Sequence, residues 1–199
     1  VEANVKFGDG SYKSSVIGFV DPTSKLLTST YHLVNGAWEA TIKEPTVFFP
    51  QIVKPMFLKP KRFMALIGGR GSGKTLVEGD HGLINMHDLG RNMMCIREFQ
   101  SSVADSVHAV LNSEIKRLEL DNSDVTERTV KFPHNNSMAR FMGLSRNPES
   151  VKSAFGFLDW WVEEAQFLSE KSLRVLTPTA RKKPKKGLPG KQKEIDTNE

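Results

Sequence analysis

The chain has 199 residues, of which 38% are hydrophobic and 26% are charged, and its formal net charge is +5. This composition is typical of a soluble globular protein, and no apolar run approaches the roughly 20 residues that a membrane-spanning helix needs. The single cysteine, Cys95, excludes an intramolecular disulfide and a cysteine-based metal cluster.

The first 50 residues predict a small β-rich extension. Three short β-prone runs are separated by the turn signals Asp-Gly, Asp-Pro and Asn-Gly, which favours an antiparallel meander. The runs are residues 16–20, 26–30 and 38–42. Four prolines between residues 45 and 60 predict a connector, with one helical turn around residues 52–58.

A glycine-rich loop is the strongest motif in the chain. Residues 62–67 read as a short apolar strand that leads into the loop, and the loop fits the phosphate-loop pattern G-x-x-x-x-G-K-[ST]. Its glycines let backbone N–H groups surround an anion, and a following helix adds its positive end. Lys74 would bind the β- and γ-phosphates of ATP, and Thr75 would bind Mg²⁺. The predicted nucleotide contacts are Gly68, Gly69, Arg70, Gly71, Ser72, Gly73, Lys74 and Thr75.

Helices and strands alternate after this loop. We expect helices over residues 74–89, 101–120 and 170–176, strands over 92–99 and 157–162, and a hairpin over 126–144. Ser169 is a suitable N-cap for the last helix. The alternation predicts an α/β phosphate-loop NTPase domain over residues 51–181, with a mostly parallel sheet flanked by helices on both faces.

Two acids follow the predicted strand at 157–162. A phosphate-loop ATPase needs two carboxylates at a strand end beside the loop, one for Mg²⁺ and one to orient the attacking water. We assign Glu163 to Mg²⁺ together with Thr75, and Glu164 to the water. Two alternatives stay open: the acids could begin a solvated helix, and Asp159 could take the metal role.

Residues 182–199 predict a basic, flexible tail. The run from Arg181 to Lys193 contains seven Lys/Arg residues and no acid, interrupted by Pro and Gly. We expect weak, salt-dependent and sequence-indifferent binding to DNA; the alternative is a solvated tail without a partner. No later region supplies a two-metal carboxylate cluster, so we expect no nuclease domain in this chain.

Four segments, in this order along the chain, resemble the large terminase subunit of tailed bacteriophages. They are residues 60–75, 95–107, 141–154 and 161–181. The resemblance implies an ATP hydrolase of the infected bacterial cytoplasm that uses Mg²⁺ and drives double-stranded DNA into a procapsid. It also implies a homo-oligomeric ring on the portal protein, with the small terminase subunit as a further partner and no membrane.

The resemblance also implies two roles for single residues. Arg70 would be an arginine finger supplied in cis, and Gln51 would contact adenine; the alternatives are a solvated loop arginine and an ordinary loop glutamine. Two other functions stay open for the chain. One is a helicase-like phosphate-loop ATPase of nucleic-acid metabolism, and the other is a non-catalytic remnant that binds DNA or partner subunits.

Overall fold

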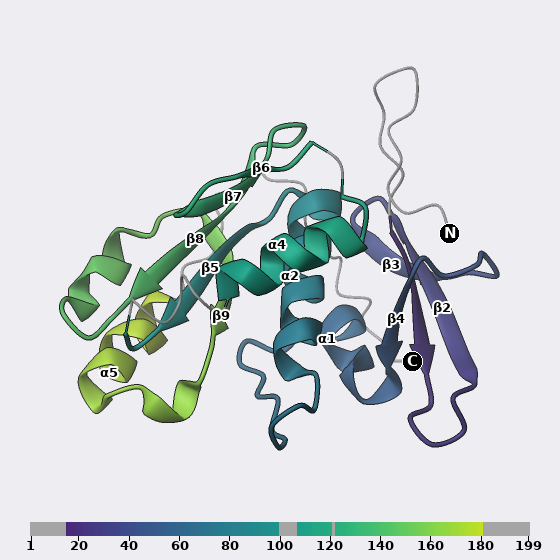
Figure 1. Cartoon of the computed structure of the whole chain (residues 1–199), viewed down its shortest axis with the longest axis horizontal. Helices are drawn as coiled ribbons and strands as arrows, with labels where there is room; N and C mark the ends of the chain where they lie inside the picture. The colour runs from purple at the N-terminus through teal and green to yellow at the C-terminus, as the bar shows by residue number, and fades with distance from the viewer. Residues whose placement is uncertain (1–14, 100–106, 121, 181–199) are drawn as a thin grey trace, which may run out of the picture.

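The computed structural model describes residues 15–99, 107–120 and 122–180, and these residues form two mixed β-sheets with helices between and around them (Figure 1). The basic tail predicted at 182–199 and the first part of the helix predicted at 101–120 lie outside the described residues. None of the described helices is both long and apolar enough to span a membrane.

The N-terminal sheet has the strand order β3-β2-β1-β4. Its strands are β1 (Val16–Val20), β2 (Leu27–Val34), β3 (Ala37–Ala40) and β4 (Val47–Pro50). The three predicted runs are confirmed as β1, β2 and β3. These three strands pair antiparallel in sequence order, as the predicted meander requires. The prediction missed β4, which lies inside the predicted connector and pairs in parallel with β1. Val47 and Phe49 explain this pairing, since both are buried in the core beside Ile17 and Phe19.

The connector also contains the predicted helical turn. The turn is divided into η1 (Gln51–Val53) and α1 (Lys54–Leu58). Phe57 of α1 lies 4.7 Å from Phe49 and 4.8 Å from His81, measured between ring centroids. These aromatic contacts join the N-terminal sheet to the helix that follows the glycine-rich loop.

The second sheet has the order β6-β7-β8-β5-β9. Its elements in chain order are α2 (Lys74–Leu89), β5 (Asn92–Arg97), α4 (Ala109–Arg117), β6 (Asp124–Val125), β7 (Thr129–Phe132), β8 (Ser137–Gly143), η3 (Pro148–Ser153), β9 (Phe157–Val162), η4 (Ala165–Phe167) and α5 (Glu170–Thr179). Strands β8, β5 and β9 are parallel, whereas β6, β7 and β8 are antiparallel. The sheet is therefore mixed, and the prediction of a mostly parallel sheet holds only for β8, β5 and β9.

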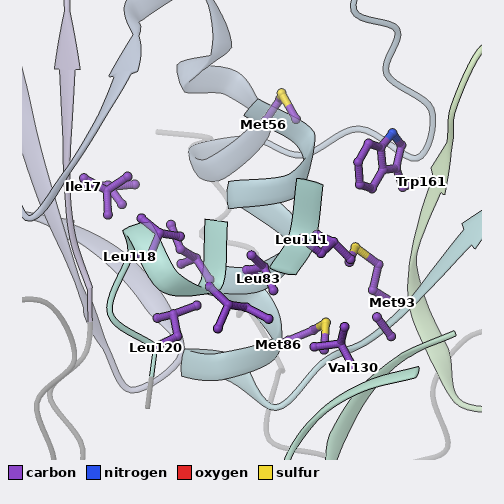
Figure 2. Packing of buried hydrophobic residues seen from close by; sticks show 14 of the residues in the cluster. Ile17, Met56, Leu83, Met86, Met93, Leu111, Leu118, Leu120, Val130 and Trp161 are labelled. Atoms are coloured by element: carbon purple, nitrogen blue, oxygen red, sulfur yellow. The ribbon is translucent and has the colours of Figure 1, made fainter. Parts of the chain in front are cut away.

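Helices cover both faces of this sheet, as predicted. Alternate residues of β5 point to opposite faces. Met93 and Cys95 join the core cluster with α2 and α4, part of which Figure 2 shows, while Met94 and Ile96 pack with α5 and η3. The last helix begins as predicted, because the Ser169 hydroxyl accepts a hydrogen bond from the Ser172 N–H.

Helix α2 lies between the two sheets (Figure 1). A Cβ atom on Gly82 would clash with the side chain of Met93 in β5, so the glycine makes room for this methionine against α2. The C-terminal end of α2 is tied to both sheets. The Asn135 amide of the β7–β8 turn donates to the carbonyls of Met86 and His87, and the Ser15 N–H donates to the Asp88 carboxylate.

Residues 62–67 do not form the predicted strand. They are irregular and belong to neither sheet; Ile67 is 95% exposed and Phe63 is 57% exposed. An apolar run becomes a strand only where a neighbouring strand satisfies its backbone groups. Among the described residues no strand pairs with it, and Arg62 instead donates to the Thr177 carbonyl of α5.

Candidate active site

The glycine-rich loop bends through two backbone conformations that favour glycine. The φ angles of Gly71 and Gly73 are 76° and 79°, in the left-handed region. Gly73 is the N-cap of α2, so the first N–H groups of this helix, which lack helical partners, lie at the end of the loop. A helix beginning directly after such a loop is a favourable place for an anion.

The side chain of Lys74 folds back over this loop. Its ammonium group donates to the carbonyl oxygens of Gly68 and Gly69, each at 2.8 Å, and to the Ser72 hydroxyl at 3.1 Å. These contacts hold one positive charge against the loop backbone. The geometry therefore combines the two features that bind a phosphate group, a fixed positive charge and free helical N–H groups.

The first turn of α2 meets the end of β9. The Thr75 hydroxyl donates to Oε1 of Glu163 at 3.0 Å, although 88 residues separate them in the chain. The indole N–H of Trp161 donates to Oε2 of the same carboxylate at 3.1 Å. The structure thus brings together Thr75 and Glu163, the two residues that the sequence assigns to a metal ion.

Glu164 contacts the neighbouring strand β5, whereas Glu163 contacts α2. Its backbone is left-handed, with φ 52° and ψ 46°, and its carboxylate forms an ion pair with Arg97 at the end of β5. A left-handed non-glycine residue costs conformational energy and is common at functional sites. The two acids form a turn between β9 and η4, and the exposed Glu164 is the N-cap of η4. The alternative in which the acids begin a solvated helix is therefore met in part by Glu164, and the role of Glu164 in orienting water stays a prediction.

Asp159, the alternative metal ligand, forms a structural link between α2 and β9. One oxygen of its carboxylate pairs with the Arg91 guanidinium at 2.5 Å, and the other accepts from the Asn85 amide at 3.2 Å. Burial raises the pKa of Asp159, while Arg91 and Asn85 act in the opposite direction. An arginine already neutralises this carboxylate, whereas no ion pair of Glu163 is found among the described residues, so Asp159 is a poorer candidate for the metal than Glu163.

Glu78 adds a third carboxylate near the site. It lies one helical turn after Thr75 in α2, and burial together with the charges of Glu163 and Asp159 raises its pKa to about 7. Burial away from water is the larger cause, and the two neighbouring negative charges add to it.

The other two predicted residues are less constrained. Arg70 is exposed at the turn of the loop, where its side chain is open to solvent. Gln51 begins η1 and is also exposed; within the described part of the chain, no hydrogen bond joins it to the loop. Among the residues that the structure describes, no hydrogen bond or ion pair joins Arg70 or Gln51 to the other predicted site residues, so both roles stay predictions.

The sequence interpretation missed three contributors to the site, which are Trp161, Arg97 and Glu78. A signal existed for Trp161, because residues i and i+2 of a strand share a face. Arg97 carried no local signal, since its contact with Glu164 depends on how β5 and β9 pair. Over residues 15–99, 107–120 and 122–180, no three His, Cys, Asp or Glu side chains are grouped to hold a metal ion.

Comparison with known proteins agrees with the order of the motifs. Residues 60–194 match the model of a family described as phage terminase large subunit, and this match begins just before the glycine-rich loop. A comparison with curated proteins gave no match. Because the family match spans more than half of the 199 residues and includes the loop, β9 and both acids, the chain belongs to the phage terminase large subunit family.

Proposed function

We propose that this chain binds ATP with Mg²⁺ at the loop of residues 68–75 and hydrolyses it, as the motor ATPase of phage DNA packaging. Membership of the terminase large subunit family supports the packaging role. The observation that carries the ATPase assignment is the 3.0 Å hydrogen bond between Thr75 and Glu163. It joins the helix after the loop to the acidic strand end, as a phosphate-loop NTPase requires.

The residues present suit a magnesium nucleotide. The N–H groups at the start of α2 and the ammonium of Lys74 bind phosphate oxygens. The Thr75 hydroxyl and the Glu163 carboxylate would hold Mg²⁺, because oxygen atoms of this kind are the ligands that it prefers. When bound, Mg²⁺ neutralises charge on the β- and γ-phosphates.

Glu164 and Arg70 carry the hydrolytic step in this proposal. Glu164 accepts a hydrogen bond from the attacking water and orients it toward the γ-phosphate. The ion pair with Arg97 holds the Glu164 carboxylate at the end of the sheet. Arg70 reaches the transferring phosphate from within the loop and stabilises the charge that develops on its oxygens.

The proposed DNA movement and the proposed partner proteins rest on membership of the terminase large subunit family. ATP turnover drives double-stranded DNA into a procapsid, in a homo-oligomeric ring that docks on the portal protein and works with the small terminase subunit. In this proposal the fold around the site is a phosphate-loop NTPase fold, and the parallel strands β8, β5 and β9 with helices on both faces support it. Residues 181–193 contribute salt-dependent contacts to DNA phosphates.

Calorimetric titration with ATP and Mg²⁺ tests the nucleotide site. Lys74→Ala removes the charge that lies over the loop and keeps the backbone, so we expect roughly 10- to 100-fold weaker ATP binding. Lys61→Ala, in the exposed segment before the loop, is the matched control and should bind as the wild type does. Equal affinity for wild type and Lys74→Ala would show that the loop is not a phosphate site.

A further inference from the structure

Trp161 donates a hydrogen bond to the carboxylate that the proposed function assigns to Mg²⁺. Its indole N–H lies 3.1 Å from Oε2 of Glu163, and the Thr75 hydroxyl lies 3.0 Å from Oε1. Each carboxylate oxygen therefore accepts one hydrogen bond and keeps a further lone pair for another partner. The two donors come from different elements, β9 and α2, so together they determine the plane of the carboxylate.

Tertiary packing fixes the direction of this indole. Trp161 is only 6% exposed and belongs to the core cluster that also holds Met93 and Leu111 (Figure 2). Its backbone pairs with Cys95 in the neighbouring strand β5. A large ring enclosed by close-packed neighbours cannot change rotamer freely, so its N–H group points to one place.

We propose that Trp161 is a positioning residue for the metal-binding carboxylate, and that its indole N–H holds Glu163 in the orientation that receives Mg²⁺ with the nucleotide. The inference rests on the proposed function, because it assigns Glu163 to the metal. Groups that orient a ligating side chain typically change metal affinity or activity by about 10- to 100-fold when they are removed. Without the indole donor, Glu163 keeps only the Thr75 contact and turns about it.

The chain offers a matched control in the same strand. Trp160 lies on the opposite face of β9, packs with the second core cluster and donates its indole N–H to the Phe157 carbonyl at 3.0 Å. Trp160→Phe therefore removes the same chemical group from the same strand without touching Glu163. A general loss of packing in β9 would affect both variants, whereas a positioning role belongs to Trp161 alone.

The first measurement is the affinity for Mg²⁺, titrated into protein saturated with ADP. We expect Trp161→Phe to weaken Mg²⁺ binding by about tenfold or more, and ADP binding in EDTA to stay unchanged. Trp160→Phe should bind Mg²⁺ as the wild type does. Equal Mg²⁺ affinities for the two variants, or an equal loss in both, would overturn the proposal.

The second measurement observes the hydrogen bond itself, and it holds even if Trp161→Phe fails to fold. The chain has three tryptophans, so its ¹⁵N–¹H spectrum has three indole N–H resonances. We expect the Trp161 resonance to move in Glu163→Gln and when Mg²⁺ with ADP is added to the wild type. An unchanged Trp161 indole chemical shift in Glu163→Gln would show that the hydrogen bond is absent and would overturn the proposal.

Measurements on Lys74→Ala and Trp161→Phe together distinguish a failure of the proposed function from a failure of this inference. If the wild type binds no nucleotide and Lys74→Ala changes nothing, the nucleotide site fails, and the positioning role fails with it even where the indole responds to Glu163→Gln. If nucleotide binding depends on Lys74 while Mg²⁺ affinity is independent of Trp161, only the positioning role is wrong.

Discussion

The two ends of α2 differ in how their polar groups are used. At the C-terminal end, Asn135 binds two helix carbonyls and Gly90, with φ 64°, donates its N–H to the Met86 carbonyl at 3.1 Å. At the N-terminal end, an exposed loop with two left-handed glycines precedes the first free N–H groups, and the ammonium of Lys74 donates to the carbonyls of this loop.

The difference shows which end is built for stability and which for a ligand. The C-terminal end meets its hydrogen-bonding needs inside the protein, from the β7–β8 turn and from its own cap. The N-terminal end keeps donors and a positive charge beside solvent, and the acidic end of β9 contacts it through the Thr75 hydroxyl. Substitutions at the N-terminal end should alter nucleotide binding or hydrolysis, and substitutions at the C-terminal end should alter the free energy of unfolding.

The largest effect on ATP turnover is expected at Arg70, in the loop that precedes the N-terminal end of α2. In other phosphate-loop enzymes an arginine finger contributes about 10³–10⁵ in rate, because it stabilises charge that exists mainly in the transition state. Arg70→Ala should therefore lower ATP turnover strongly in a phosphate-release assay and leave ATP affinity nearly unchanged. Arg146→Ala, an exposed arginine after β8, is the control. Lost binding with unchanged turnover per bound ATP would contradict the role of Arg70.

Glu164 should separate binding from hydrolysis at the same end. Glu164→Gln keeps the size of the side chain but removes the carboxylate that orients water, so turnover should fall by about 10²–10⁴. ATP binding, measured by calorimetry, should remain. A variant that hydrolyses ATP at the wild-type rate would move the catalytic role to another carboxylate, Glu163 or Asp159.

At the C-terminal end of α2, the expected effect is on the free energy of unfolding. Asn135→Ala removes two hydrogen bonds to α2 and a third with the Ser137 N–H, which should cost about 2–3 kcal/mol of unfolding free energy. Nucleotide affinity should stay at the wild-type value. Denaturant titration measures the loss, with Asn112→Ala in α4 as the control. An Asn135→Ala variant with unchanged stability but weakened nucleotide binding would contradict the assignment of the C-terminal end of α2 to stability.

The smallest effect is the pH dependence caused by Glu78. Its folded pKa of about 7 is above the usual value of 4.5, so folding disfavours its charged form and stability decreases as pH rises between these values. Glutamine lacks this penalty. Allowing for the solvent that still reaches the side chain, Glu78→Gln should gain stability over the wild type by about 1 kcal/mol more at pH 8 than at pH 5. Parallel stability–pH curves for the two proteins would show that Glu78 is not desolvated.

Elements with a strong local pattern could be predicted from the sequence. Strand β9 has the predicted bounds, and α2 begins at the residue after the glycine loop and ends before Gly90, as its pattern indicates. The sequence also identified Thr75 and Glu163 as partners before any geometry was known. For β9 and α2 the information lies in neighbouring residues, because helix periodicity, turns and caps depend on short separations along the chain. For Thr75 and Glu163 it lies in the two motifs, because phosphate-loop chemistry needs both groups on one metal ion.

Strand pairing and the contacts between distant elements were decided only by the tertiary structure. The run at 62–67 is as apolar as a strand, but strand formation needs a partner, and neither sheet of the described residues includes it. The same reason applies to the parallel pairing of β4, to the ion pair of Arg97 with Glu164, and to the Asn135 contacts with α2. The amino-acid sequence by itself determined the loop, its helix and the acidic strand. Which side chain meets which across the sheets depended on register and packing between segments far apart in the chain, and no local pattern encodes these.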